Sequence, residues 1–182
     1  LNAALRLFAA YGYDAVGVQA IVEPVGVTKP TLYHYFGSKR GLFETLVQEQ
    51  SAPLLDDVRV ATTYAGDVTR SIETIIRAYF DYAEENPIFY RMLLSMWFAP
   101  PSSEYFPSVH ALFQQQFLLI EDMFRQAAND HGNMKGRQQQ YAVSLKGMID
   151  TYIAVAFQGL IDLKQSNVEY RLGHQFMHGI FS

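Results

Sequence analysis

The sequence predicts an all-α protein in which a small N-terminal helix-turn-helix unit precedes a larger helical bundle. Apolar side chains recur at helical spacing along nearly all of the 182 residues, and alternating apolar and polar runs between turn signals are scarce. The composition, with 49% hydrophobic and 18% charged residues, is typical of a globular chain, and no cysteine is present for a disulfide or a thiolate metal site. We therefore expect a cytoplasmic protein without a membrane-spanning segment.

Short helices occupy the first part of the chain and end at glycines. The first helix ends near Gly12, and its inner face comprises Leu1, Ala4, Leu5 and Phe8. A second helix repeats the apolar spacing over 18–25 and closes at Gly26. Thr28 is placed to cap a third helix over 29–36. The short turn between the second and third helices, which contains a glycine, is typical of a helix-turn-helix.

Longer helices are expected from Ser38 onward, because this serine can cap a fourth helix. Turn signals rich in proline, glycine and asparagine divide the rest of the chain into helices near 67–86, 87–98, 105–130, 137–163 and 168–181. The net charge of -4 resides beyond residue 50, since acidic and basic residues balance before it. We expect two domains: residues 1–50 form the helix-turn-helix domain, and residues 51–182 form the larger bundle.

The third helix carries different chemistry on its two sides. On a helical wheel, Leu32 and Phe36 fall together on an inner apolar face. His34 lies opposite them, between a proline and a threonine, and Tyr33 and Tyr35 lie on the two shoulders. A phenol in that position either packs at the edge of the core or points its hydroxyl toward a phosphate. The sequence leaves both interpretations of the tyrosines open.

Positive charge is concentrated at the same place. The stretch 28–40 contains Lys29, Lys39 and Arg40 and no acidic residue, which predicts a patch of three outward-facing positive charges. Lys39 follows the Ser38 cap, at a helix N-terminus that also attracts phosphate. These features predict that the third helix reads DNA. Because so small a basic footprint binds DNA weakly, a dimer is expected.

Four motifs follow one another in the first fifty residues: LFAAYGY at the end of the first helix, GVTK in the turn, TLYHYF in the third helix and SK at the start of the fourth. Together they resemble the N-terminal domain of the TetR family of bacterial transcriptional regulators. The resemblance implies a homodimeric regulator, most often a repressor, that binds a palindromic double-stranded operator and is nucleoid-associated. It also implies that a small-molecule effector in the C-terminal bundle releases the operator, without a cofactor and without enzymatic activity.

The resemblance assigns DNA contacts to particular positions. The implied contact residues are Gln19, Thr28, Lys29, Pro30, Thr31, Tyr33, His34, Tyr35 and Lys39. Two residues depart from the family pattern. Gly17 stands where a Ser or Thr usually caps the second helix and touches phosphate, so we expect one contact fewer. Pro24 stands where a small helix former is usual, and we expect it to shorten or kink the second helix.

Aromatic residues are concentrated between positions 79 and 124, well above the 14% of the whole chain. For any single residue, packing in a bundle core is the simpler explanation. The family resemblance favours a mainly apolar ligand cavity with a few polar groups. The candidate ligand-binding residues are Tyr79, Tyr82, Phe89, Tyr90, Trp97, His110, Phe113, Gln114 and Phe117.

The segment MIDTYIAVAFQGLI, residues 148–161, is apolar on nearly all sides. Such a helix needs cover both from its own core and from a partner. Paired with 168–181, it predicts a four-helix interface about a two-fold axis, as in the family that the chain resembles. The candidate interface residues are Tyr152, Ile153, Ala156, Phe157, Leu160, Phe176 and Ile180.

Catalytic and metal-site patterns are weak. His174 and His178 have the i, i+4 spacing of metal ligands but lack an evident third ligand. We find no Gly-rich phosphate loop, no GxSxG and no HExxH motif, so neither an enzyme nor a metal site is expected. The rival hypothesis is a helical ligand-binding or protein-interaction module whose N-terminal helices serve only for packing. The residues leave activation and repression undecided.

Overall fold

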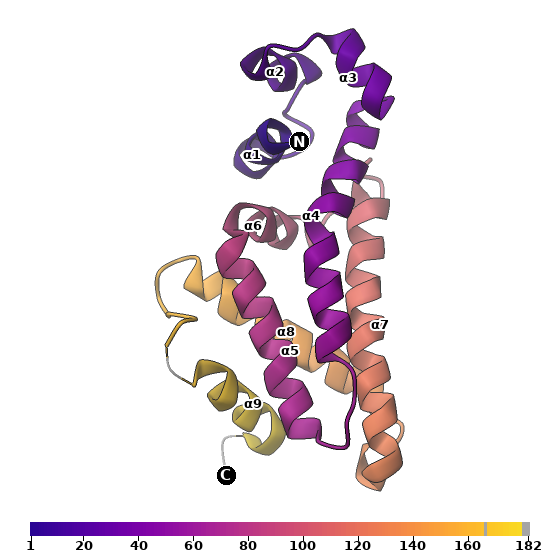
Figure 1. Ribbon diagram of the computed structural model, residues 1–182, viewed down its shortest axis with the longest axis vertical. Coiled ribbons are helices and arrows are strands. Elements are labelled where there is room, and N and C mark those ends of the chain that lie inside the picture. The colour runs from indigo at the N-terminus through magenta and orange to yellow at the C-terminus, as the bar shows by residue number, and fades with distance from the viewer. Residues whose placement is uncertain (166, 180–182) are drawn as a thin grey trace. The chain divides into compact units, whose positions relative to one another are not determined.

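The structure is a computed structural model that describes residues 1–165 and 167–179 (Figure 1). All regular secondary structure in these residues is helical, which confirms the predicted all-α class. None of the helices in this part of the chain has the length and apolarity that crossing a bilayer requires. The chain divides into two compact units. The first unit comprises Leu1–Ala52 and Ile88–Leu112, and the second comprises Pro53–Pro87 and Phe113–Ser182.

The helices at the N-terminus follow the predicted order. They are α1 (Asn2–Tyr11), α2 (Val18–Val22), α3 (Lys29–Phe36) and α4 (Lys39–Ala61), of which α4 continues into the second unit. Three buried rings hold α1 against α4: the centroid of Phe43 lies 5.6 Å from that of Phe8 and 5.2 Å from that of Tyr13. Phe8 and Tyr13 are themselves 5.3 Å apart. This aromatic cluster is the core on which the helix-turn-helix rests.

The second helix is shorter than the predicted segment 18–25 because of Pro24. Proline has no N–H to continue the helical ladder, and a 3-10 turn over Glu23–Val25 replaces the last α-helical turn. Gly26 then takes a left-handed conformation with φ of 67° and ends the segment. The structure thus agrees with the shortening expected from Pro24.

The junction between α3 and α4 is tightly constrained. Oγ1 of Thr28 accepts a hydrogen bond from the N–H of Thr31 at 3.3 Å, and Oγ of Ser38 accepts one from the N–H of Gly41 at 2.9 Å. Both residues are therefore the N-caps that the sequence predicted. A Cβ added to Gly41 would lie 2.0 Å from the carbonyl oxygen of Phe36. The backbone of α3 approaches α4 so closely that position 41 has no room for a side chain.

Five more helices complete the fold. They are α5 (Val68–Glu85), α6 (Pro87–Met96), α7 (Phe106–Asp130), α8 (Gln138–Ala156) and α9 (Val168–His178). The prediction of one helix over 137–163 is wrong at its end. α8 stops at Ala156, and Gly159 has a left-handed φ of 76°, which ends a helix. The predicted helix over 168–181 is described only up to Gly179, so its last part lies outside the described residues.

In the second unit, α9 lies alongside α5 (Figure 1). The two helices approach closely at Gly173, where an added Cβ would lie 3.4 Å from the Glu73 side chain and 3.6 Å from that of Ile72. Arg77 and Glu169 form an ion pair at 2.9 Å, but the arginine side chain is 55% exposed. An exposed ion pair contributes little to the stability of the fold. Burial of apolar surface is therefore the main force that holds α9 against α5.

Candidate nucleic-acid interface

The helix-turn-helix exposes most of the residues that were predicted to contact DNA. The exposed members of the predicted set are Gln19, Thr28, Lys29, Pro30, Thr31, Tyr33, His34 and Tyr35. Tyr33 retains 45% and Tyr35 74% of its accessible surface, so neither ring is core packing. On the inner side, Leu32 is buried as predicted, whereas Phe36 is only half-buried.

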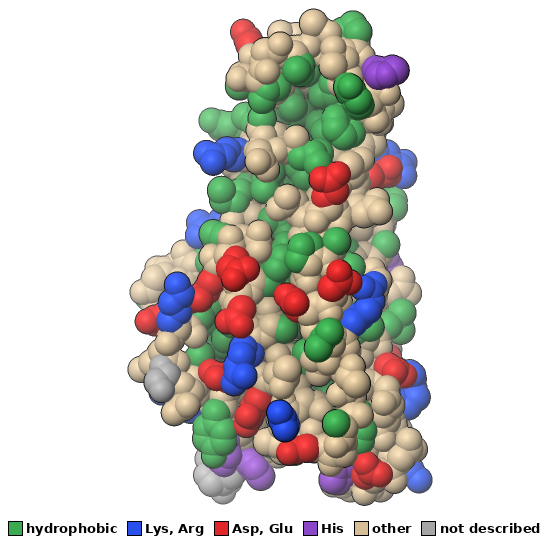
Figure 2. Space-filling model, viewed as in Figure 1, with side chains coloured by type: hydrophobic (Ala, Val, Ile, Leu, Met, Phe, Trp, Pro, Cys, Tyr) green, Lys and Arg blue, Asp and Glu red, His purple; other side chains and the backbone are tan. Residues whose placement is uncertain are grey.

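The outer side of α3 brings hydroxyl, imidazole and phenol groups together. The rings of His34 and Tyr35 lie edge to face with centroids 5.3 Å apart, and the hydroxyls of Thr28 and Thr31 lie 2.9 Å apart. Such groups bind phosphate oxygens and base edges. Beside them, residues of α1, α2 and α3 line an apolar groove of about 260 Å³. Figure 2 shows hydrophobic side chains gathered over these helices.

The predicted patch of three outward-facing positive charges is only partly present. Nζ of Lys39 donates to the carbonyl oxygens of Tyr13 at 3.0 Å and Val16 at 3.1 Å, and it lies 4.1 Å from the centre of the Tyr13 ring. Arg40 forms an ion pair at 2.7 Å with a carboxylate one turn further along α4. Lys29 is exposed. The outward orientation predicted for Lys39 is therefore wrong: its ammonium fastens the connection between α1 and α2 to α4. A phosphate contact by Lys39 stays a prediction.

Replacement of Lys39 with Met is expected to lower the free energy of unfolding by about 1 to 3 kcal/mol, since hydrogen bonds from a charged donor to two carbonyls are lost. The matched substitution Lys29→Met, at an exposed position on α3, should leave stability unchanged and weaken DNA binding. Urea denaturation followed by circular dichroism measures the first effect. If both variants unfold at the same urea concentration as the wild type, the hydrogen bonds of Lys39 do not stabilise the packing of the α1–α2 connection against α4.

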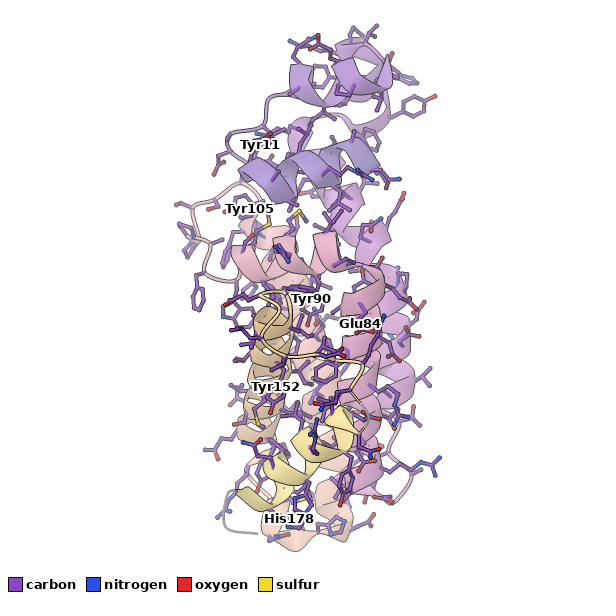
Figure 3. The ribbon with its side chains drawn as sticks, turned by 90° about the vertical axis from the view of Figure 1, so that its left-hand side faces the viewer. Tyr11, Glu84, Tyr90, Tyr105, Tyr152 and His178 are labelled. Atoms are coloured by element: carbon purple, nitrogen blue, oxygen red, sulfur yellow. The ribbon has the colours of Figure 1, made fainter. Side chains whose placement is uncertain are left out.

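Tyr13 connects the helix-turn-helix to the segment between α6 and α7. Its hydroxyl donates a hydrogen bond to Oε2 of Glu104 at 2.7 Å. The ring of Tyr105, labelled in Figure 3, lies 5.3 Å from that of Tyr13 and 5.9 Å from that of Phe43. Burial, together with the hydrogen bond to Glu104, raises the pKa of Tyr13, so the phenol keeps the proton that it donates. Sequence reasoning missed this connection, because Tyr13 and Glu104 are 91 residues apart.

The predicted ligand residues are divided between the two units. Phe89, Tyr90, Trp97 and His110 belong to the first unit, and Tyr79, Tyr82, Phe113, Gln114 and Phe117 belong to the second. The second unit contains a cavity of about 670 Å³, which residues of α5, α7, α8, α9 and the α7–α8 connection line. None of the nine predicted residues is among the residues that line this cavity. Their role in ligand binding stays a prediction.

A buried polar cluster lies between α5 and α8 in the second unit. Lys146 is 2% exposed, and its Nζ lies 2.6 and 2.5 Å from the carboxylate oxygens of Asp150 and 4.9 Å from the centre of the Tyr79 ring. Burial lowers the pKa of Lys146, although the neighbouring carboxylate of Asp150 partly offsets this effect. Burial raises the pKa of Tyr79, and the negative charge of Asp150 raises it further. The Tyr79 hydroxyl has no hydrogen-bond partner among the described residues. Lys146 was not identified from the sequence. A lysine between apolar residues on a core helix could have indicated a buried, paired charge, because lysine is rarely buried without a partner.

The structure separates the predicted dimer residues. Ile153 is 0% exposed within its own chain, so its side chain packs in the core of that chain, and its role in a dimer interface stays a prediction. Leu160 is 71% exposed, just after α8. The half-buried members are Tyr152, Ala156, Phe157 and Phe176. Tyr152, labelled in Figure 3, stacks on Phe80 with ring centroids 6.4 Å apart. Ile180 lies outside the described residues.

Comparisons with known proteins match the N-terminal helices most strongly. Residues 1–46 match the model of the family described as bacterial regulatory proteins, tetR family. The HTH-type transcriptional activator FasR of Mycolicibacterium smegmatis is 33% identical over 93 residues, which are 51% of this chain and 42% of FasR. The HTH-type transcriptional repressor BdcR of Escherichia coli is 40% identical over 63 residues, or 32% of each chain. The chain thus spans less than half the length of these two relatives.

The likeness of the fold extends over the remaining helices. The crystal structure of the transcriptional regulator FadR from Bacillus subtilis in complex with stearoyl-CoA has a TM-score of 0.80 and 16% identity, and it covers 98% of this chain and 96% of FadR. At such low identity, this similarity establishes a shared fold and nothing more. The matched relatives are transcriptional regulators rather than enzymes, in agreement with the prediction of a non-enzymatic protein. From the family match over residues 1–46 and the helix-turn-helix geometry, we conclude that residues 1–46 form a helix-turn-helix domain of the kind found in bacterial regulatory proteins of the tetR family.

Proposed function

We propose that the protein is a homodimeric transcriptional regulator that binds a palindromic operator in the cytoplasm and acts as a repressor. The outer side of α3 carries this proposal, because its polar and aromatic side chains are exposed rather than packed. A recognition helix of this kind lies in the major groove. Residues 1–50 then act as the DNA-binding domain, and residues 51–182 bind the ligand and form the dimer.

Exposed apolar side chains on α8, on α9 and between them support the homodimer. Val143 is 54%, Leu160 is 71% and Tyr170 is 52% exposed. A second copy of the chain would remove such side chains from water. Two α3 helices related by a two-fold axis would then match two half-sites of a palindrome.

The proposed effector is a small apolar or aromatic molecule that binds the C-terminal bundle. FadR, which shares the fold, was crystallised with stearoyl-CoA, a ligand with a long apolar chain. The hydrogen bond between Tyr13 and Glu104 supports a route of communication, because it ties the segment before α7 to the helix-turn-helix. We expect the effector to bind more tightly to a conformation in which the two recognition helices no longer fit the operator. Such a ligand would lower operator affinity, and the coupling free energy between two such sites is typically about 1 to 3 kcal/mol.

Salt dependence tests the proposed DNA binding against the rival interaction module. We expect the affinity of the full chain for a fluorescent DNA duplex, measured by anisotropy, to fall by about tenfold or more between low and physiological salt. An apolar contact with a protein partner would change little over this range. Absence of binding to any duplex at low salt would exclude the proposal.

A further inference from the structure

The cavity of the second unit has the size of a small-molecule site. Its volume of about 670 Å³ falls within the range of roughly 300 to 1,000 Å³ that is common for ligand pockets. Five segments meet around it: the start of α5, the end of α7, the connection before α8, α8 itself and the end of α9. These segments come from distant parts of the sequence, so the cavity is a product of the tertiary fold.

One part of the wall is aromatic and sulfur-rich. The ring of Phe124 lies 5.4 Å from that of Tyr141 and 6.0 Å from that of Phe176. Val68 and three methionines, Met134, Met148 and Met177, are further apolar residues of the lining. Aromatic faces stack on flat ligands, and methionine side chains adapt to irregular shapes. This lining favours a planar aromatic ligand.

Among the described residues, the polar part of the wall contains no carboxylate, ammonium or guanidinium group. It consists of hydroxyl, amide and imidazole side chains, namely Thr69, His131, Asn133, Ser144 and Gln175. Such groups can orient a ligand through hydrogen bonds. Four of these side chains, Thr69, Asn133, Ser144 and Gln175, are exposed, so the cavity is open to solvent. A charged ligand would gain no opposite charge from the described lining in exchange for the hydration that it gives up there. The lining therefore favours an uncharged ligand.

We propose that this cavity is the effector site and that it takes an uncharged, planar aromatic molecule. The proposal rests on the proposed function, since the ligand would regulate operator binding. It goes further by placing the effector at the α7–α8 end of the second unit, among residues other than the aromatics between Tyr79 and Phe117.

Two dyes of similar size but different charge test the proposal on the full chain. The uncharged naphthalene dye prodan should bind saturably, with one dye per subunit and a blue-shifted emission. The anionic naphthalene dye ANS should bind at least about tenfold more weakly, because none of the described residues that line the cavity has an ammonium or guanidinium group. Stronger binding of ANS than of prodan would overturn the assignment of an uncharged ligand.

Filling the cavity tests its location. Ser144→Phe places a ring in the cavity and should weaken prodan binding by about tenfold or more. Gln139→Phe adds the same ring at an exposed position of α8 and should leave dye binding unchanged. If Ser144→Phe does not fold, Gln175→Trp provides a second block from the side of α9. Unchanged prodan binding by a folded blocking variant would overturn the site.

Oligomeric mass and operator affinity separate the remaining outcomes. If Ser144→Phe dissociates a wild-type dimer in light scattering, the cavity is a contact between copies of the chain and the proposal fails. Prodan binding that leaves operator affinity unchanged would overturn the cavity's role as the effector site, while DNA binding by α3 would stand. Absence of operator binding by the dye-free wild type would instead reject the proposed function itself.

Discussion

His34→Ala is expected to weaken binding to the selected operator by about 10- to 100-fold, because loss of one good base contact costs about 1 to 3 kcal/mol. The side chain lies on the exposed outer side of α3, so its removal should leave the melting temperature unchanged. Tyr33→Ala should also weaken operator binding, since this ring is 45% exposed on the same helix. Anisotropy titrations with the operator, and circular dichroism melts of the same preparations, measure both properties.

Tyr11→Ala is the matched control for the recognition helix. This tyrosine is 69% exposed, but it lies at the end of α1, outside the predicted contact set. We expect its removal to leave operator affinity unchanged. If the variants at Tyr33 and His34 are folded and bind the operator as tightly as the Tyr11 variant, the assignment of α3 as the reading helix is wrong.

Gly41→Ala is expected to destabilise the chain by about 3 kcal/mol or more, since backbone strain and steric overlap are among the largest single-residue effects. The added Cβ would lie 2.0 Å from the carbonyl oxygen of Phe36. Because that oxygen belongs to the backbone, α3 and α4 must move apart to relieve the overlap. Urea denaturation measures the lost stability, and we expect operator affinity to fall with it because α3 is displaced.

Gly17→Ser is the matched control for an added side chain. Gly17 is the N-cap of α2, its φ and ψ are -83° and 153°, and a Cβ there meets nothing within 4 Å. A serine cap should stabilise α2 by a few tenths of a kcal/mol relative to glycine. The two glycine variants should thus change stability in opposite directions. A Gly41→Ala variant as stable as the wild type would show that the α3–α4 junction is not constrained in this way.

Local features of the fold could be predicted because they depend on neighbouring residues. Thr28 and Ser38 cap helices within three residues of themselves, and both caps are present. The inward side of α3 follows from helical periodicity alone, and Leu32 is buried as expected. Pro24 acts on its own helix, so its effect on α2 was also predictable.

Features that depend on distant segments could not be predicted in this way. Lys39 turns inward because the fold brings the carbonyls of Tyr13 and Val16 within reach, 26 and 23 residues away. The 670 Å³ cavity exists only where five separate segments meet, and no periodic pattern marks it. Ile153 belongs to an apolar run whose two sides look alike in the sequence, so packing decides which side faces the core.

Selection of bound duplexes from a random DNA pool tests the central claim most directly. The full-length chain is incubated with the pool, bound DNA is recovered and sequenced over several rounds, and His34→Ala is carried in parallel. We predict that the wild type enriches a palindrome whose half-sites are separated by about one or more helical turns, and that His34→Ala loses this preference. A pool that remains random after repeated rounds with the wild type would contradict operator recognition by α3.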